Sequence, residues 1–166
     1  MKPNQIYLTV HLISPARLSL EKIGEILSRH VPLQLSEEST LRIRTCREYL
    51  DRKIADSDDL FYGINTGFGS LCNIRISDDD IEQLQHNLVV SHACGTGDLV
   101  PPEIVRIMLL LKIQSLSYGH SAVRVELVQR LIDFYNEGVF PVIFELGSLG
   151  ASGDLAPLAH LSLPLI

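Results

Sequence analysis

A stretch rich in small residues carries the triplet Ala151-Ser152-Gly153, which Asp154 follows. A serine nucleophile elbow needs the pattern G-x-S-x-G, but Asp154 stands where its second glycine belongs. The segment Gly95-Thr96-Gly97 fails as a dinucleotide fingerprint because Val100 replaces the third glycine, and no G-K-[ST] occurs anywhere. Local pattern alone therefore indicates a tight turn before a helix at 151–153.

Two further residues could carry chemistry. Tyr62 precedes a glycine-rich stretch that includes Gly67, and periodicity fails throughout residues 56–77, so Tyr62 should lie on a loop. His92 falls near the end of a predicted helix. From these patterns alone, Tyr62 is an aromatic anchor, Gly67 a turn glycine and His92 a capping or surface residue.

Three longer segments change that interpretation. Residues 147–160 (GSLGASGDLAPLAH) closely resemble the signature of the histidine and phenylalanine ammonia-lyases. Residues 62–69 (YGINTGFG) resemble a second motif of this aromatic amino-acid ammonia-lyase family, and residues 87–95 (NLVVSHACG) a third. The motifs occur in the family's order, and the resemblance covers nearly the whole chain after about residue 20.

The resemblance implies that Ala151-Ser152-Gly153 cyclises to 4-methylidene-imidazole-5-one, the family's electrophilic prosthetic group. The Gly153 nitrogen would attack the Ala151 carbonyl carbon, in a bend that a side chain at 153 would obstruct. Loss of the Ser152 hydroxyl would leave the exocyclic methylene. A helix beginning near Asp154 would favour negative charge on the ring.

The same resemblance assigns the remaining candidate site residues. Elimination of ammonia needs a base at the β-carbon as well as an electrophile for the amino group, and Tyr62 corresponds to that base. Gly67 corresponds to a substrate-binding position that allows close backbone approach. His92 corresponds to a residue that histidine- and tyrosine-specific members keep, whereas phenylalanine-specific members carry an apolar pair there. An imidazole would match a substrate imidazole or phenol, which disfavours phenylalanine.

The N-terminal half should supply mostly helices to position these residues. A weak alternation predicts a short strand over residues 6–12, and apolar spacing predicts a helix from Ser19 that ends before Pro32. Ser36 should cap a longer helix. Its predicted inner face is Leu41, Cys46, Tyr49 or Leu50, and Ile54.

Further helices follow in the C-terminal half. Ser77 with three aspartates predicts a helix start, and that helix should end before Gly95. Residues 103–116 are apolar nearly all round and predict a buried helix, and residues 125–137 predict an amphipathic one that Gly138 ends. Residues 140–144 predict a brief strand, and Asp154 should cap a last helix.

Composition narrows the class of protein. The 166 residues predict one domain, and the net charge of −6 disfavours nucleic acid and anionic membranes as partners. Three dispersed cysteines without a CxxC pair predict a reducing compartment and no structural metal. The N-terminus lacks a signal-peptide pattern and no apolar run reaches a bilayer span, so we expect a soluble cytoplasmic protein.

The sequence therefore predicts a mainly α-helical α+β fold, with residues 1–166 forming a single N-terminal domain of an ammonia-lyase-like protein. The chain ends without a helix stop signal, so we expect it to lack a downstream helical bundle and to be inactive by itself. By resemblance, the full-length protein would be a homotetramer that converts L-histidine to urocanate and ammonia in histidine catabolism. The alternatives are a tyrosine ammonia-lyase, an aminomutase, and a non-catalytic folded module.

Overall fold

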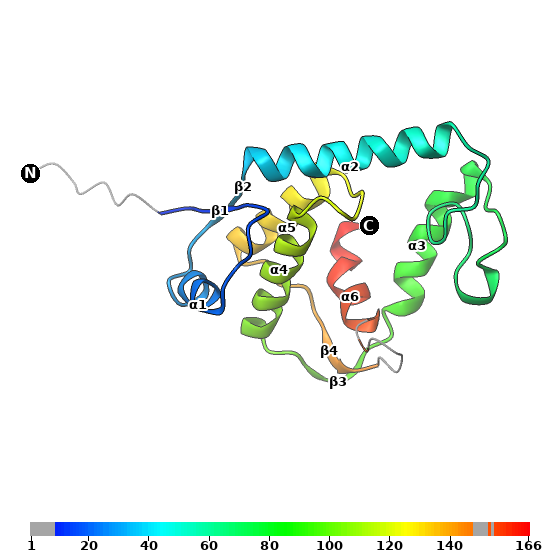
Figure 1. The fold of residues 1–166 in the computed structure, drawn as a ribbon. Helices are drawn as coiled ribbons and strands as arrows, with labels where there is room; N and C mark the ends of the chain where they lie inside the picture. The colour runs from blue at the N-terminus through cyan, green and yellow to red at the C-terminus, as the bar shows by residue number, and fades with distance from the viewer. Residues whose placement is uncertain (1–8, 148–152, 154) are drawn as a thin grey trace, which may run out of the picture. The chain divides into compact units, whose positions relative to one another are not determined.

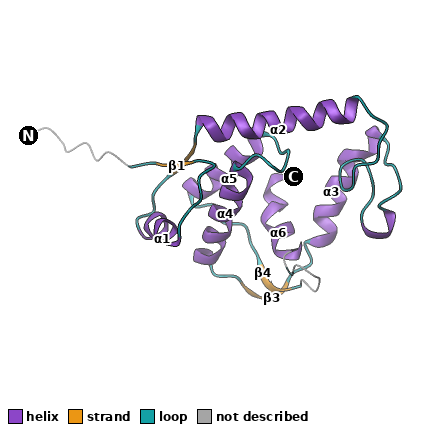
Figure 2. Cartoon of the chain, in the orientation of Figure 1, coloured by secondary structure: helices purple, strands orange, loops and turns teal. Residues whose placement is uncertain are grey.

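The computed structural model describes residues 9–147, 153 and 155–166. Helices make up most of its secondary structure, and the short strands of the described residues form two two-stranded sheets (Figure 1; Figure 2). The prediction of a mainly helical α+β chain is confirmed. The chain divides into two compact units, Met1–Arg52 with Pro102–Phe140, and Lys53–Pro101 with Pro141–Ile166. That residues 1–166 act as a single domain stays a prediction.

The first unit begins with a short parallel sheet. Strand β1 (His11–Ile13) pairs with β2 (Leu33–Leu35), and helix α1 (Leu20–Ser28) connects the two. The predicted helix start is confirmed, because the Ser19 hydroxyl oxygen accepts the Lys22 N–H at 3.2 Å. The strand predicted over residues 6–12 overlaps only the start of β1, and its residues 6–8 lie outside the described residues.

Helix α2 (Glu37–Ala55) begins where predicted, since the Ser36 hydroxyl oxygen accepts the Ser39 N–H at 3.1 Å. The predicted inner face was wrong in part. The helix buries Ser39 and Ile43. Leu41, predicted to face inward, is instead 62% exposed. Of the two alternatives at the next position, Leu50 is partly buried and Tyr49 is 61% exposed.

A close backbone contact explains which face of α2 is buried. Gly119 has a φ of +73°, and a Cβ atom there would lie 2.7 Å from the carbonyl carbon of Arg42. The chain around Gly119 therefore rests on the side of α2 that carries Ser39, Arg42 and Ile43, which are neighbours at helical spacing. Leu41 lies on another side of the helix, so its apolar character does not decide its burial.

Helices α4 (Pro102–Ser117) and α5 (Val125–Glu137) pack against each other and supply most of this unit's core (Figure 1). The predicted end of α5 is confirmed at Gly138, which has a φ of +68° in the left-handed cap position. The prediction that α4 is buried all round was wrong for Ile104 and Leu111, which are 44% and 46% exposed. The buried apolar residues of the two helices include Val105, Leu109, Leu110, Ile113, Val128, Leu131 and Ile132.

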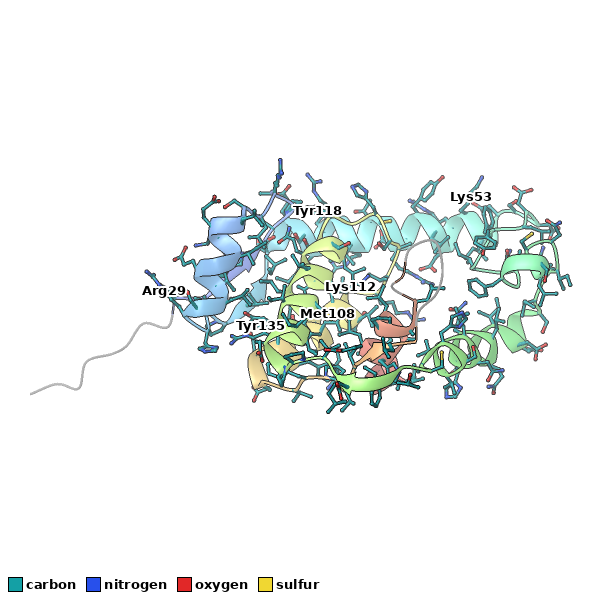
Figure 3. All side chains as sticks on the ribbon, turned by 90° about the horizontal axis from the view of Figure 1, so that it is seen from below. Arg29, Lys53, Met108, Lys112, Tyr118 and Tyr135 are labelled. Carbon is teal, nitrogen blue, oxygen red and sulfur yellow. The ribbon has the colours of Figure 1, made fainter. Side chains whose placement is uncertain are left out.

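An aromatic ring also belongs to this core. Tyr135, labelled in Figure 3, is 2% exposed, and the Arg106 guanidinium carbon lies 4.8 Å from its ring centroid. Arg106 also contacts Nδ1 of His30. Burial raises the pKa of the Tyr135 phenol, and the charge of Arg106 opposes that rise. The phenol is neutral at physiological pH and contributes packing rather than charge.

The second unit is built around a helix pair and a short antiparallel sheet. Helix α3 (Ile81–His92) packs against α6 (Leu155–Ser162), and β3 (Thr96–Leu99) pairs with β4 (Phe144–Leu146). Half of the eight residues of α6 are buried, but α3 has no fully buried residue in this chain. The buried apolar residues of this unit include Ile143, Ala156, Ala159 and Leu161.

The predicted boundaries in this unit are partly confirmed. Helix α3 follows a 3-10 turn at Asp78–Asp80 and ends before Gly95, as the sequence indicates. The strand predicted over residues 140–144 lies instead at Phe144–Leu146, because Pro141 has no N–H to donate to a ladder. The cap predicted at Asp154 lies outside the described residues. No helix in the described part of the chain is long and apolar enough to cross a bilayer.

We expect Asn136 to stabilise β2 through paired hydrogen bonds. Its Oδ1 accepts the Leu33 N–H at 2.8 Å, and its Nδ2 donates to the Leu33 carbonyl at 2.9 Å. Asn136→Ala should lower the free energy of unfolding by about 1–3 kcal/mol, because Leu33 is buried and loses both partners. Chemical denaturation measures this loss.

Gln129→Ala is the matched control on α5. Its amide donates to the Asp133 carboxylate in a solvent-exposed contact, so its effect should stay within about 0.5 kcal/mol. Equal losses for the two variants would contradict the role given to Asn136.

Candidate active site

The loop that carries Tyr62 is organised around a buried asparagine. Asn65 is 2% exposed, and its Oδ1 accepts the Phe61 N–H at 2.7 Å. Its Nδ2 donates to the Asp59 carbonyl at 2.9 Å. One side chain therefore satisfies backbone groups on the approach to Tyr62, in a segment without regular secondary structure.

Thr66 forms a second buried point in the same loop. It is fully buried, and its hydroxyl donates to the Gly67 carbonyl at 2.9 Å while accepting the Gly63 N–H at 3.3 Å. The Thr66 backbone forms a β-bridge with Arg75. The next residue continues this pairing, because the Gly67 N–H donates to the Ile74 carbonyl at 3.1 Å. The prediction of an irregular loop over residues 56–77 is confirmed, and hydrogen bonds give it a defined shape.

Tyr62 projects from this loop toward solvent. Its side chain is 63% exposed, and its ring meets the Phe68 ring edge-on with centroids 5.8 Å apart. The phenol oxygen accepts the Gly69 N–H at 3.4 Å. The loop thus holds the ring at one position and leaves the phenol accessible to a substrate or to a further protein segment.

Gly67 has a packing reason to be glycine. A Cβ atom there would lie 2.6 Å from the Leu71 Cβ and 3.0 Å from the Leu71 carbonyl oxygen. These contacts come from the short turn Gly69–Leu71 of the same loop. The structure therefore accounts for Gly67 without a substrate, and its substrate-binding role stays a prediction.

His92 is the last residue of α3 and is half-buried. Its Nδ1 lies 2.8 Å from the Leu88 carbonyl oxygen, with the Ser91 hydroxyl 3.2 Å away. A carbonyl oxygen can only accept, so Nδ1 carries the proton in this contact. In the neutral ring Nε2 is then an acceptor, available to an N–H or O–H group.

Three segments meet just beyond His92, at Gly95. The Gly95 N–H donates to Nε2 of His160 on α6 at 2.8 Å, and the Phe144 ring centroid lies 5.4 Å from that of His160. Gly147 has a φ of +131°, and a Cβ atom on it would lie 2.7 Å from the Gly95 Cα. The Cys94 thiol lies 3.7 Å from the Gly147 carbonyl oxygen. The Gly95 contacts therefore join the end of α3 to both ends of the 147–160 segment.

The triplet predicted to form the prosthetic group is only partly described. Ala151 and Ser152 lie outside the described residues. Gly153 is exposed with a φ of +71°, and a Cβ atom on it would meet nothing within 4 Å. That left-handed conformation favours glycine, as the predicted bend requires.

The structure groups the predicted site residues into two places. It brings Tyr62 and Gly67 together in one loop, and it connects His92 with the 147–160 segment through Gly95. Sequence reasoning assigned no chemistry to His160, although the residue lies within the family motif. Its partly buried hydrogen bond to Gly95 depends on a contact across 65 positions, which no local pattern reveals.

Comparison with known proteins decides the family. The sequence model of the family described as aromatic amino acid lyase matches residues 18–166. The chain belongs to this family. It is 50% identical to histidine ammonia-lyase from Legionella pneumophila strain Philadelphia 1 over 155 residues, which is 93% of this chain and 30% of that protein. This aromatic amino acid lyase chain thus spans about 30% of the length of the relatives it matches.

Solved structures agree with this assignment. Histidine ammonia-lyase from Trypanosoma cruzi superposes with a TM-score of 0.78 at 35% identity, covering 92% of this chain and 28% of that one. Tyrosine aminomutase from Streptomyces globisporus gives a TM-score of 0.84 at 31% identity, covering 95% and 29%. The resemblance carried by the three motifs is confirmed, and the fold is that of the family's N-terminal region.

We expect the Thr66 hydroxyl to order the backbone next to Tyr62. Thr66→Val keeps the side-chain shape but removes the oxygen that accepts the Gly63 N–H. Hydrogen exchange of the Gly63 amide should become at least about tenfold faster, because its partner is lost. Thr66→Ser keeps the hydroxyl and should leave this amide protected, even if loss of the methyl group lowers overall stability. Unchanged protection in Thr66→Val would contradict this assignment.

Proposed function

We propose that this chain is the N-terminal part of a histidine ammonia-lyase, a carbon–nitrogen lyase that converts L-histidine to urocanate and ammonia. The main support is the likeness to histidine ammonia-lyases at 44–50% identity. His92 adds a chemical reason, because an imidazole fixed through Nδ1 presents Nε2 as an acceptor. The substrate imidazole has an N–H that can donate to it.

The prosthetic group would form from Ala151, Ser152 and Gly153. The left-handed φ and open surroundings of Gly153 fit such a bend, since they accept glycine and leave room for a backbone rearrangement. The 4-methylidene-imidazole-5-one ring would supply the electrophile that holds the substrate amino group. No metal or nucleotide enters this proposal.

Tyr62 is proposed as the base that takes the β-proton at its phenol oxygen. Its 63% exposure leaves that oxygen accessible, and the contacts with Phe68 and the Gly69 N–H limit where it can point. A base contributes only when it reaches the proton it removes, so contacts that restrict the direction of the phenol would help to aim it at the β-proton. Gly67 would keep the same loop close to the substrate.

His92 is proposed to select the substrate. A phenyl ring has no N–H or O–H to donate to Nε2, so phenylalanine would leave a polar group unmatched. A tyrosine phenol can donate, and tyrosine ammonia-lyase is therefore the second candidate. An aminomutase is the third, supported by the fold shared with the Streptomyces tyrosine aminomutase at a TM-score of 0.84.

The full-length enzyme is proposed to act in the cytoplasm as a homotetramer. The three cysteines are free, which fits a reducing compartment. Exposed apolar side chains around Tyr62, among them Leu60, Leu71 and Ile74 at 46–51% exposure, fit coverage by further protein. The 166-residue chain alone would lack part of the site and would behave as a folded, non-catalytic module.

A urocanate assay on the full-length protein tests the proposal. L-Histidine should yield urocanate, detected by its ultraviolet absorbance, and Ser152→Ala should abolish the product. Tyr62→Phe should lower kcat by about 10²–10⁴-fold, since it keeps the packing against Phe68 but removes the base.

Tyr49→Phe is the matched control, because Tyr49 is similarly exposed on α2 and should retain full activity. Product from L-tyrosine alone would transfer the assignment to the tyrosine enzymes. A β-amino acid product would indicate an aminomutase, and no product from either amino acid would refute the lyase proposal.

A further inference from the structure

His160 is a buried side chain that the proposed reaction does not use. It is 7% exposed on α6, and its Nε2 accepts the Gly95 N–H at 2.8 Å. Because Nε2 is the acceptor, Nδ1 carries the proton of the neutral ring. A histidine is rarely needed merely to fill space in a core, so its hydrogen bond is the feature to explain.

The surroundings of Gly95 leave no space for a side chain at this position. A Cβ atom on Gly95 would lie 2.8 Å from His160 Nε2 and 3.0 Å from the Phe144 Cβ. A Cβ atom on Gly147 would in turn lie 2.7 Å from the Gly95 Cα. The bond therefore fixes the chain just after α3 against both α6 and the end of β4.

The consequence concerns His92, three residues before Gly95. His92 ends α3, and the Ala93 N–H closes the helix by donating to the Val89 carbonyl at 3.1 Å. Since α3 has no fully buried residue of its own in this chain, the link to His160 is a specific restraint on where its last turn lies. A shift of that turn would move the imidazole of His92.

We propose that His160 is a positioning residue for substrate recognition: by holding the Gly95 amide, its Nε2 fixes the place of His92 in the site. This inference rests on the proposed function, because it requires that His92 contacts the substrate. His160 itself touches no substrate. A purely structural His160 would affect stability without acting through His92.

A double-mutant cycle in the full-length enzyme tests the inference. His160→Leu removes the acceptor and should raise KM for L-histidine about tenfold, with a smaller change in kcat. In a His92→Ala background the same substitution should change KM less than about twofold, because the residue it positions is gone. His160→Gln, whose amide oxygen can accept the Gly95 N–H, should restore KM to within about threefold of the unmodified enzyme.

Binding measurements separate this inference from the lyase assignment. The dissociation constant of L-histidine is measured by calorimetry in a Ser152→Ala background, where turnover is absent, and His160→Leu should weaken it about tenfold. If His160→Leu does not fold, His160→Asn replaces it, because its shorter amide does not reach Gly95. An active enzyme in which His160 and His92 substitutions act additively on KM, or in which KM is unchanged, would overturn the inference. Absence of urocanate from the unmodified enzyme would instead refute the proposed function.

Discussion

The approach of three backbone segments at Gly95 is the constraint on which the second unit depends. A side chain at Gly95 or Gly147 would collide with the neighbouring segment, and His160 completes the contact by accepting the Gly95 N–H. The end of α3, the end of β4 and the buried face of α6 are placed together by this contact. Gly147 and His160, which begin and end the family motif at residues 147–160, therefore both have a packing role.

The loop around Tyr62 is stabilised by a different kind of interaction. Asn65 and Thr66 are almost completely buried, and their polar groups replace the ladder hydrogen bonds that the loop lacks. The first unit instead relies on apolar packing between α4 and α5. A loop held by hydrogen bonds can keep an aromatic side chain such as Tyr62 exposed without losing its shape.

Local rules predicted the helices well because capping is a short-range effect. Ser19, Ser36 and Gly138 mark helix ends in the structure as they do in the sequence. Strands were predicted poorly, since β2 depends on Asn136, which lies 103 positions away. The buried face of α2 likewise depends on the distant Gly119, so apolar spacing alone placed Leu41 on the buried side although it is exposed.

In the candidate site, too, local sequence patterns gave less than the family motifs and the long-range contacts of the fold. Roles for Tyr62, His92 and the 151–153 triplet could be proposed only through the family motifs, because each has an ordinary structural explanation by local pattern. Gly67 has such an explanation in the structure as well, through its contact with Leu71. The role inferred for His160 required the fold, because the partner of its imidazole is far away in sequence.

We propose that Ala151-Ser152-Gly153 becomes the prosthetic group of a lyase. Tandem mass spectrometry of the peptide that contains residues 151–153, prepared from the full-length protein, measures whether the ring forms. If it does, the peptide mass is lowered by two water molecules, one from cyclisation and one from the Ser152 hydroxyl. The Ser152→Ala variant has no hydroxyl to lose, so its peptide can lose at most the water of cyclisation. An unmodified mass in folded full-length protein would show that the chain has the family's fold without its prosthetic group.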